Sequence, residues 1–141
     1  MRALDRLQPL GLFVLRVVLG VIMVAHGYPK IFGGIGHHVQ FVGSLGLSGW
    51  LAYPSAAAEF FGGILLIAGL FTRWAAFAVF INMFVAIARV HWHNGLLGQG
   101  GYQFPLSLEA IAFAVVFSGA GAISLDYALR GKSGGSSKRN S

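Results

Sequence analysis

A long apolar run over residues 10–32, LGLFVLRVVLGVIMVAHGYPKIF, is the feature that most constrains this chain. The hydrocarbon core of a bilayer is about 30 Å thick, and a helix needs roughly 20 apolar residues to cross it. The run has that length and no small-residue cleavage site follows it, so we expect a transmembrane helix and not a secretion signal. Residues 54–71, 74–90 and 104–123 form three further apolar runs. The sequence therefore predicts four membrane-spanning helices.

The composition also favours a lipid environment. Of the 141 residues, 56% are hydrophobic and only 10% are charged, whereas a soluble domain has about 25% charged residues. A chain this short has too much surface to hide that many apolar side chains from water. It contains no cysteine, which excludes disulfides, thiolate metal sites and dithiol redox chemistry. A redox role would therefore need a bound cofactor or a partner protein.

Loop length and charge predict the topology. Only Thr72 and Arg73 separate the second and third runs, so we predict an all-α, antiparallel four-helix bundle in the membrane, formed by residues 1–130. The positive-inside rule places both termini in the cytoplasm, because the opposite side carries only Lys30 and Arg89. The basic residues on the cytoplasmic side are Arg2, Arg6, Arg73, Arg130, Lys132, Lys138 and Arg139.

The net charge of +6 does not indicate nucleic acid, because the basic residues gather at the termini and form no stripe with aromatic residues. Residues 131–141, GKSGGSSKRNS, are small, polar and basic, and we expect a disordered tail that sets topology. In the alternative, the tail holds anionic lipid at about 1 kcal/mol per basic residue.

Ionisable residues inside the predicted spans are the candidate site, because such residues are costly in lipid and usually face the bundle interior or a cavity. Arg16 lies toward the cytoplasmic end, where we assign it a structural role, bonding Asp126 or a loop carbonyl; Arg73 is likewise structural. The others lie toward the outer face, so we predict a polar cavity there in which Arg89 pairs with Glu59 or Glu109. Helical spacing or proximity adds further residues, giving the set His26, Lys30, Glu59, Asn82, Arg89, His93, Tyr102, Gln103 and Glu109.

Three interpretations of this polar set remain open. The charges could neutralise one another and lock the helices together, they could line a ligand-binding cavity, or they could form a proton or ion pathway. A metal site is not expected, because His91 and His93 are two residues apart and point to opposite sides of a helix. No spacing typical of zinc ligands occurs.

Four sequence blocks, spread over about residues 10–129, resemble the DoxX family of small bacterial membrane proteins. The first is LRVVLGVIMVAHGYPKIFGG, which contains Arg16, His26 and Lys30, and the second is AEFFGGILLIAGLFTRWAA, which contains Glu59. The third and fourth are HWHNGLLGQGGYQFP and GAGAISLD. The resemblance implies a multi-pass protein of the bacterial inner (plasma) membrane with four helices.

The resemblance also implies a link to redox chemistry, since some relatives are tied to quinone-coupled sulfur oxidation and others to oxidative or electrophile stress. It suggests a quinone as ligand, and a subunit of a quinone-linked oxidoreductase that works with a partner redox protein. Many relatives carry an acidic residue where this chain has Gln103, and Glu109 is the candidate replacement.

The functional hypothesis is a cavity that binds a small amphipathic molecule, with a quinone as the leading candidate. Arg89 and Lys30 would donate hydrogen bonds to its oxygens, Glu59 and Glu109 would balance charge or relay protons, and His26 would lie near the cavity floor. One alternative is a non-catalytic scaffold that assembles or stabilises a partner enzyme. Another is a small-molecule permease, which would have to form a homo-oligomer.

Overall fold

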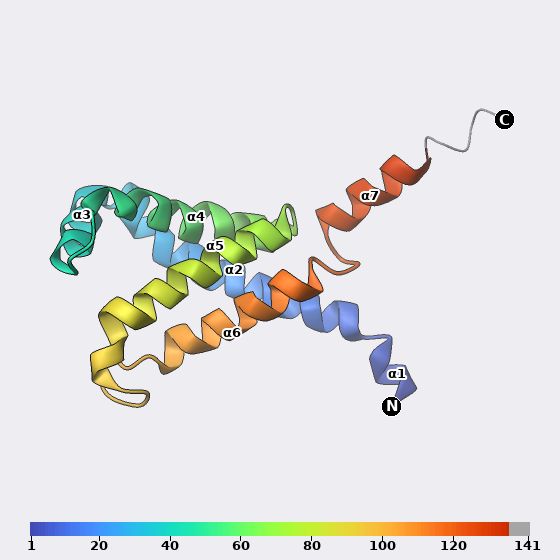
Figure 1. Cartoon of the computed structure of the whole chain (residues 1–141). Helices are drawn as coiled ribbons and strands as arrows, with labels where there is room; N and C mark the ends of the chain where they lie inside the picture. Colours follow the sequence, from blue (N-terminus) through green and yellow to red (C-terminus); the bar gives the residue numbers. More distant parts are fainter. Residues whose placement is uncertain (136–141) are drawn as a thin grey trace.

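A computed structural model describes residues 1–135, and the regular structure in that range is entirely helical, as the sequence predicts (Figure 1). Four helices pack side by side: α2 against α4, α4 against α5, α5 against α6, and α6 against α2. Figure 1 shows the two terminal helices, α1 and α7, at one end of these four helices and α3 at the other. The bounds are α1 Arg2–Asp5, α2 Gln8–Phe32, α3 Ile35–Ser44, α4 Ala52–Ala68, α5 Thr72–Ala86, α6 Gln103–Ser118 and α7 Leu125–Gly135.

Three helical stretches are long and apolar enough to cross a bilayer. They are Gln8–Phe32, Gly49–Ala68 and Thr72–Asn94, and they contain most of the first three predicted spans. The fourth apolar helix, α6, has only 16 residues, so the predicted span 104–123 is too long at its C-terminal end. The helix stops because Gly119 has φ 76° and ψ −162°, a backbone conformation that glycine adopts readily and other residues avoid.

Close backbone contact joins α2 to α4. A Cβ atom added to Gly20 would lie 2.6 Å from the carbonyl oxygen of Gly63, and one added to Gly63 would lie 2.7 Å from that of Gly20. Small residues at such positions let two helices approach closely where lipid gives no hydrophobic drive to pack them. This contact fixes the register of α2 on α4, which brings Lys30 beside Glu59.

The core and the outer surface are both apolar. Side chains of α2, α4, α5 and α6 fill the core, whereas large hydrophobic side chains on the same helices face outward. An apolar surface of this extent needs an apolar surrounding, which agrees with the prediction of a lipid environment. The outward-facing residues include Val18, Phe61, Phe77, Phe84, Phe113 and Phe117.

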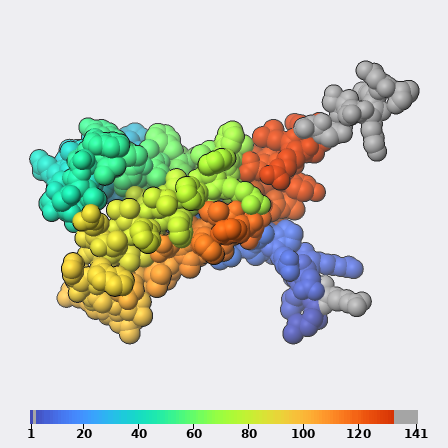
Figure 2. Space-filling view, in the orientation of Figure 1, coloured from blue at the N-terminus to red at the C-terminus, as the bar shows by residue number. Residues whose placement is uncertain are grey.

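The two terminal helices project from the packed body at the same end (Figure 2). Helix α7 continues to Gly135, so it reaches into the segment for which the sequence predicts a disordered tail. Residues 136–141, which include Lys138 and Arg139, lie outside the described residues.

Candidate functional site

An ion pair between α2 and α4 forms the centre of the candidate site. Lys30 Nζ lies 2.7 Å from Glu59 Oε1 and 2.5 Å from Oε2. Among the side chains that the structure describes, this is the one ion pair. The Glu59 residue is only 4% exposed, whereas the Lys30 side chain is 27% exposed. A buried carboxylate of this kind is tolerated only when it is paired and hydrogen-bonded.

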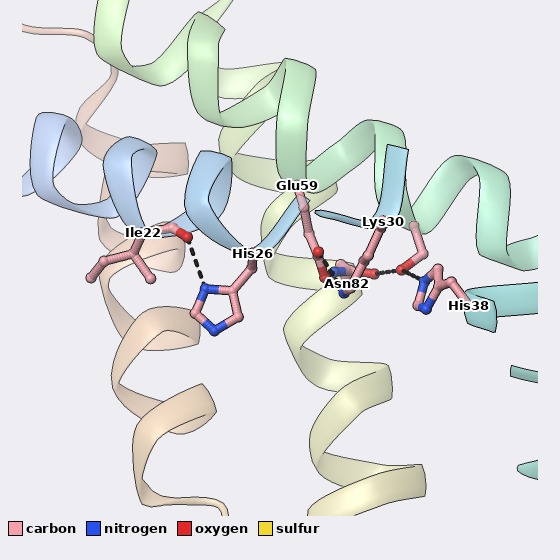
Figure 3. Close-up of polar contacts among 7 residues, drawn as sticks. Ile22, His26, Lys30, His38, Glu59 and Asn82 are labelled. Atoms are coloured by element: carbon pink, nitrogen blue, oxygen red, sulfur yellow. Dashed lines mark hydrogen bonds and ion pairs between the residues drawn. The ribbon is translucent and has the colours of Figure 1, made fainter. Parts of the chain in front are cut away.

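Three further side chains extend the pair into a chain of hydrogen bonds (Figure 3). Asn82 Nδ2 of α5 donates to Glu59 Oε1 at 2.8 Å, and Ser55 Oγ of α4 donates to Asn82 Oδ1 at 2.7 Å. His38 Nε2 of α3 lies 3.4 Å from Ser55 Oγ. We call these five residues the polar chain: Lys30, His38, Ser55, Glu59 and Asn82. It joins four helices.

The direction of the polar chain follows from its donors. Ser55 has one hydroxyl hydrogen and gives it to Asn82, so its oxygen accepts from the N–H at Nε2 of His38. Burial lowers the pKa of His38 below its ordinary 6.5, and the positive charge of Lys30 lowers that pKa further while Glu59 opposes the change. His38 is therefore neutral at pH 7. Every donor in the chain leads toward Glu59, the acceptor at its end.

A cavity of about 330 Å³ lies beside the polar chain. Its volume falls within the range of small-molecule sites, about 300–1,000 Å³. All five members of the polar chain line it, and every other lining residue is apolar. Those apolar residues come from α3, the segment before α4, α4 itself and α5 with its continuation: Phe41, Val42, Leu45, Leu47, Leu51, Pro54, Ile81, Val85, Ala86 and Val90.

The predicted pairing of Arg89 with Glu59 or Glu109 is wrong. Arg89 is exposed and forms no ion pair with any described residue. After Ala86 the α5 helix passes into a π-helical turn, Ile87–His91, whose wider turns shift the phase of everything beyond it. Asn82 therefore faces Glu59 while Arg89 does not, and Lys30 neutralises the carboxylate instead.

The rest of the segment RVHWHNG closes the connection to α6. His91 Nδ1 lies 2.7 Å from the carbonyl oxygen of Gly100, to which Asn94 Nδ2 also donates at 3.1 Å. Trp92 stacks on Tyr102 with 5.5 Å between ring centroids. The polar residues at the end of this helix therefore hold a loop together.

The remaining predicted site residues do not line the cavity. His26 is exposed, bonds the carbonyl of Ile22 at 2.9 Å and lies 6.0 Å from the ring of Phe104; Figure 3 shows it apart from the polar chain. Glu109 on α6 is half-buried. The structure thus gathers Lys30, Glu59 and Asn82 from the predicted set but leaves out His26, Arg89, His93, Tyr102, Gln103 and Glu109.

Two members of the polar chain were not predicted. Ser55 precedes Glu59 by four residues, so helical spacing alone places both on one face of α4. His38 joins the site because α3 packs on α2 and α4. No local pattern in the sequence predicts that contact. Within residues 1–135, no group of three His, Asp or Glu side chains is placed to hold a metal ion.

The other end of the helices carries a different arrangement. Arg16 donates to the carbonyl oxygens of Ala120 and Ile123 at 2.5 and 2.7 Å, so its partner is a loop carbonyl, one of the two predicted. Asp126 accepts from the backbone N–H groups of Phe71 and Thr72 at 2.9 and 3.0 Å. Burial raises the pKa of Asp126, but these hydrogen bonds and the charge of Arg130 outweigh it, so the pKa lies below its ordinary 3.8.

Comparison with known proteins places the chain. A family model described as DoxX matches residues 11–92, the range that contains the whole polar chain. The protein belongs to the DoxX family. A second family model, "TQO small subunit DoxD", matches residues 55–140. The resemblance read from the four sequence blocks is therefore confirmed.

Several curated relatives match this DoxX protein over nearly its full length. "Putative oxidoreductase CatD" of Bacillus subtilis is 34% identical, over 89% of this chain and 92% of its own length. An uncharacterized protein of Haemophilus influenzae is 33% identical, over 89% and 96%. "Inner membrane protein YqjF" of Escherichia coli is 25% identical, over 92% and 99%. No solved structure matches the chain.

Proposed function

We propose that this DoxX protein binds a quinone, or a similar small amphipathic molecule, in the cavity beside the polar chain, as the membrane component of a redox or stress-response system. One observation carries the proposal. The cavity is apolar except along one wall, and all the polar groups of that wall belong to a single connected chain. A pocket of this kind takes a mostly apolar molecule and orients it by one polar end.

The residues present fit a quinone head group. Lys30 uses two of its three N–H groups on Glu59, which leaves one to donate to a carbonyl oxygen. Glu59 holds the Lys30 ammonium in place and balances its charge, and Asn82 in turn fixes Glu59. The apolar side chains of α3 and α5 that line the cavity would face the ring and tail. A bound quinone would supply the redox chemistry that a cysteine-free chain lacks.

The polar chain positions groups and does not conduct protons. Its middle member, Asn82, links Ser55 to Glu59 through an amide, and an amide neither gains nor loses a proton at ordinary pH. This argues against the proton pathway among the interpretations left open by the sequence. It favours a site in which Glu59 and Lys30 are held in fixed places for a ligand.

The proposed topology has four crossings with both termini in the cytoplasm of a bacterial inner membrane. Helix α6 is about 24 Å long, so it crosses if the bilayer thins locally or if its ends lie in the interface. Among the described residues, Arg6 follows α1, Arg130 and Lys132 lie on α7, and Arg73 lines a cavity with α7. These basic residues belong to the end that carries the terminal helices (Figure 1), which supports a cytoplasmic position for that end. The cavity then lies toward the outer face.

The relatives support the proposal that the protein is the membrane component of a redox system. The name of CatD refers to a putative oxidoreductase, and that of YqjF to the inner membrane. The second family model describes a small subunit, which supports a partner redox protein. Since the chain has no cysteine, such a partner would supply or accept the electrons.

Copurification tests the proposal directly. Full-length protein is isolated from native membranes, and its bound lipids are identified by mass spectrometry and ultraviolet absorption. We expect a near-stoichiometric quinone in the wild type, its loss in Lys30→Gln, and its retention in the control Arg89→Gln. A folded wild type that carries no quinone and takes up none from added stocks would rule the quinone out.

A scaffold is the second candidate, because the polar chain also ties four helices together and could serve only that purpose. The substitution Ala86→Phe separates the two functions, since it fills the cavity without removing any hydrogen bond of the polar chain. A scaffold keeps its effect on a partner enzyme after this change. A protein that acts by binding quinone would lose its effect on the partner enzyme after the same change.

A further inference from the structure

A second cavity, of about 290 Å³, lies at the opposite end of the helices from the quinone site. It is formed by the start of α5, the segment that follows α6, and α7. Its charged lining residues are Arg73, Asp126 and Arg130, and Tyr127 lies beside them. The remaining lining comes from the small residues 118–122. Neither the cavity nor its arginines take part in the function proposed above.

Arg73 is held in place at this cavity. Its Nη1 donates to the carbonyl oxygen of Val116 at 3.1 Å. The guanidinium also lies against Gly119, where an added Cβ atom would sit 3.2 Å from Nε and 3.3 Å from Nη2. A glycine at this position therefore leaves room for the planar group, whose other N–H groups remain available to a ligand.

The charge balance of the cavity favours an anion. Asp126 is its one carboxylate, and both oxygens already accept backbone N–H groups, from Phe71 and Thr72. Two arginines thus face one carboxylate whose hydrogen-bonding capacity is largely taken. The guanidinium group matches phosphate oxygens in a two-pronged geometry that an ammonium group cannot reproduce.

The surroundings indicate that the anion belongs to a lipid. Next to Arg73 in the sequence is Trp74, which is 75% exposed, and Phe117 and Tyr127 are also exposed at this end. Exposed aromatic side chains beside basic ones are typical of the boundary between hydrocarbon and head groups. The cytoplasmic leaflet, where the proposed topology places this end, is rich in anionic lipid.

We propose that this cavity binds the phosphate group of an anionic phospholipid, with Arg73 and Arg130 as its donors. The proposal rests on the membrane placement of the chain and is independent of the quinone. A bound lipid would bridge α5 and α7, and so hold α7 against the four packed helices.

Native mass spectrometry of the full-length protein tests this, with phosphatidylglycerol or phosphatidylcholine added to the detergent. We expect the wild type to retain phosphatidylglycerol preferentially, and Arg130→Gln to weaken that binding about tenfold, as expected for the loss of a charge-assisted hydrogen bond. Arg130→Lys, which keeps the charge but not the fork, should lie between the two. Arg73→Gln should weaken lipid binding as Arg130→Gln does, provided that the variant folds. Because Arg130 is exposed, its substitution should not disturb folding, and the Arg130 variants are sufficient to test the proposal.

Arg6→Gln is the matched control, because it removes the same charge near the same end but outside the cavity. If Arg6→Gln and Arg130→Gln weakened phosphatidylglycerol binding equally, the binding would reflect general electrostatic attraction, and the proposal would be overturned. Equal retention of the two lipids by the wild type would do the same. Displacement of the lipid by millimolar inorganic phosphate would assign the cavity to a soluble phosphate compound and overturn the lipid.

Discussion

The two ends of the packed helices both use polar side chains, but they use them differently. At the end away from the termini, Lys30, Glu59 and Asn82 bond one another and leave a cavity beside them. At the end that carries the termini, Arg16 and Asp126 bond backbone groups where helices begin and end. Backbone groups need partners wherever water is excluded, so the second arrangement follows from the fold alone.

Polar side chains that bond only one another are not required by the fold in this way. Apolar residues of similar volume could replace a buried ion pair without loss of stability, and often with a gain. A polar chain kept beside a cavity therefore points to a ligand, whereas Arg16 and Asp126 use their hydrogen bonds on the backbone. The lipid proposed for the second cavity is assigned to Arg73 and Arg130 and not to these two residues. This difference can be tested at each end separately.

The largest effect is expected from Glu59→Leu. It leaves the Lys30 ammonium and the Asn82 amide without their acceptor, and loss of one partner of a buried ion pair costs roughly 3 kcal/mol or more. Thermal unfolding in detergent measures the loss. The double variant Glu59→Leu/Lys30→Met should recover most of the lost stability while binding no quinone. If the double variant were as unstable as Glu59→Leu alone, the ion pair would be required for stability and not for a ligand.

Arg16→Leu is expected to cost about 2–3 kcal/mol, because it leaves the carbonyl oxygens of Ala120 and Ile123 without their donor. Arg16 is only 1% exposed, so water cannot replace it. Quinone affinity per folded molecule should not change. Chemical denaturation followed by tryptophan fluorescence gives the stability, and a parallel drop in affinity would contradict the separation of the two ends.

Asp126→Ala should cost about 1 kcal/mol at pH 7, the usual value for a side chain that accepts N–H groups at the start of a helix. The pKa of Asp126 is lower in the folded protein than its ordinary 3.8. Its contribution is therefore present above pH 4 and is lost as the pH falls through the folded pKa. Unfolding curves of wild type and variant should converge in acid, and a constant gap down to pH 2 would exclude the ionised carboxylate as the cause.

His38 should give a smaller effect of pH at the other end. Its pKa in the folded protein lies below 6.5, so the folded state binds a proton less readily than the unfolded chain, and stability falls as the pH drops from 7 toward 5. The variant His38→Gln should not show this fall. Melting temperatures across that range check it, with His37→Gln, which changes an exposed neighbour, as the control.

Arg89→Ala should have the smallest effect, within about 0.5 kcal/mol, as is usual for an exposed residue away from special features. Its ligand binding should equal that of the wild type, because Arg89 does not line the cavity. A loss of several kcal/mol in the free energy of unfolding would instead support the pairing of Arg89 with a carboxylate that the sequence predicts.

The sequence predicts the helical fold and the lipid environment well, because both follow from the length of apolar runs. It also singles out Lys30, Glu59 and Asn82, which the structure brings together, because an ionisable or amide group in a long apolar run is unusual wherever it occurs. It misplaces the end of α6, since only the backbone angles of Gly119 show that the helix stops there.

The sequence prediction fails at a local irregularity in one helix and at a contact between two elements. The π-helical turn at Ile87–His91 changes which residues of that stretch face α4, and a regular 3.6-residue period cannot anticipate it. His38 enters the site through the packing of α3 on α4. The first error therefore lies within one helix, and the second lies in a contact between two elements.

The most direct test of the ligand site is a binding isotherm for a soluble quinone analogue, measured on full-length protein in lipid nanodiscs. Two variants are compared with the wild type: Ala86→Phe, which fills the cavity, and Ala110→Phe, which adds the same side chain to an exposed position of α6 outside it. We expect saturable binding by the wild type and Ala110→Phe, and at least about tenfold weaker binding by Ala86→Phe at an unchanged melting temperature. Equal affinity in all three proteins, or no saturable binding in any, would contradict a quinone site at the polar chain.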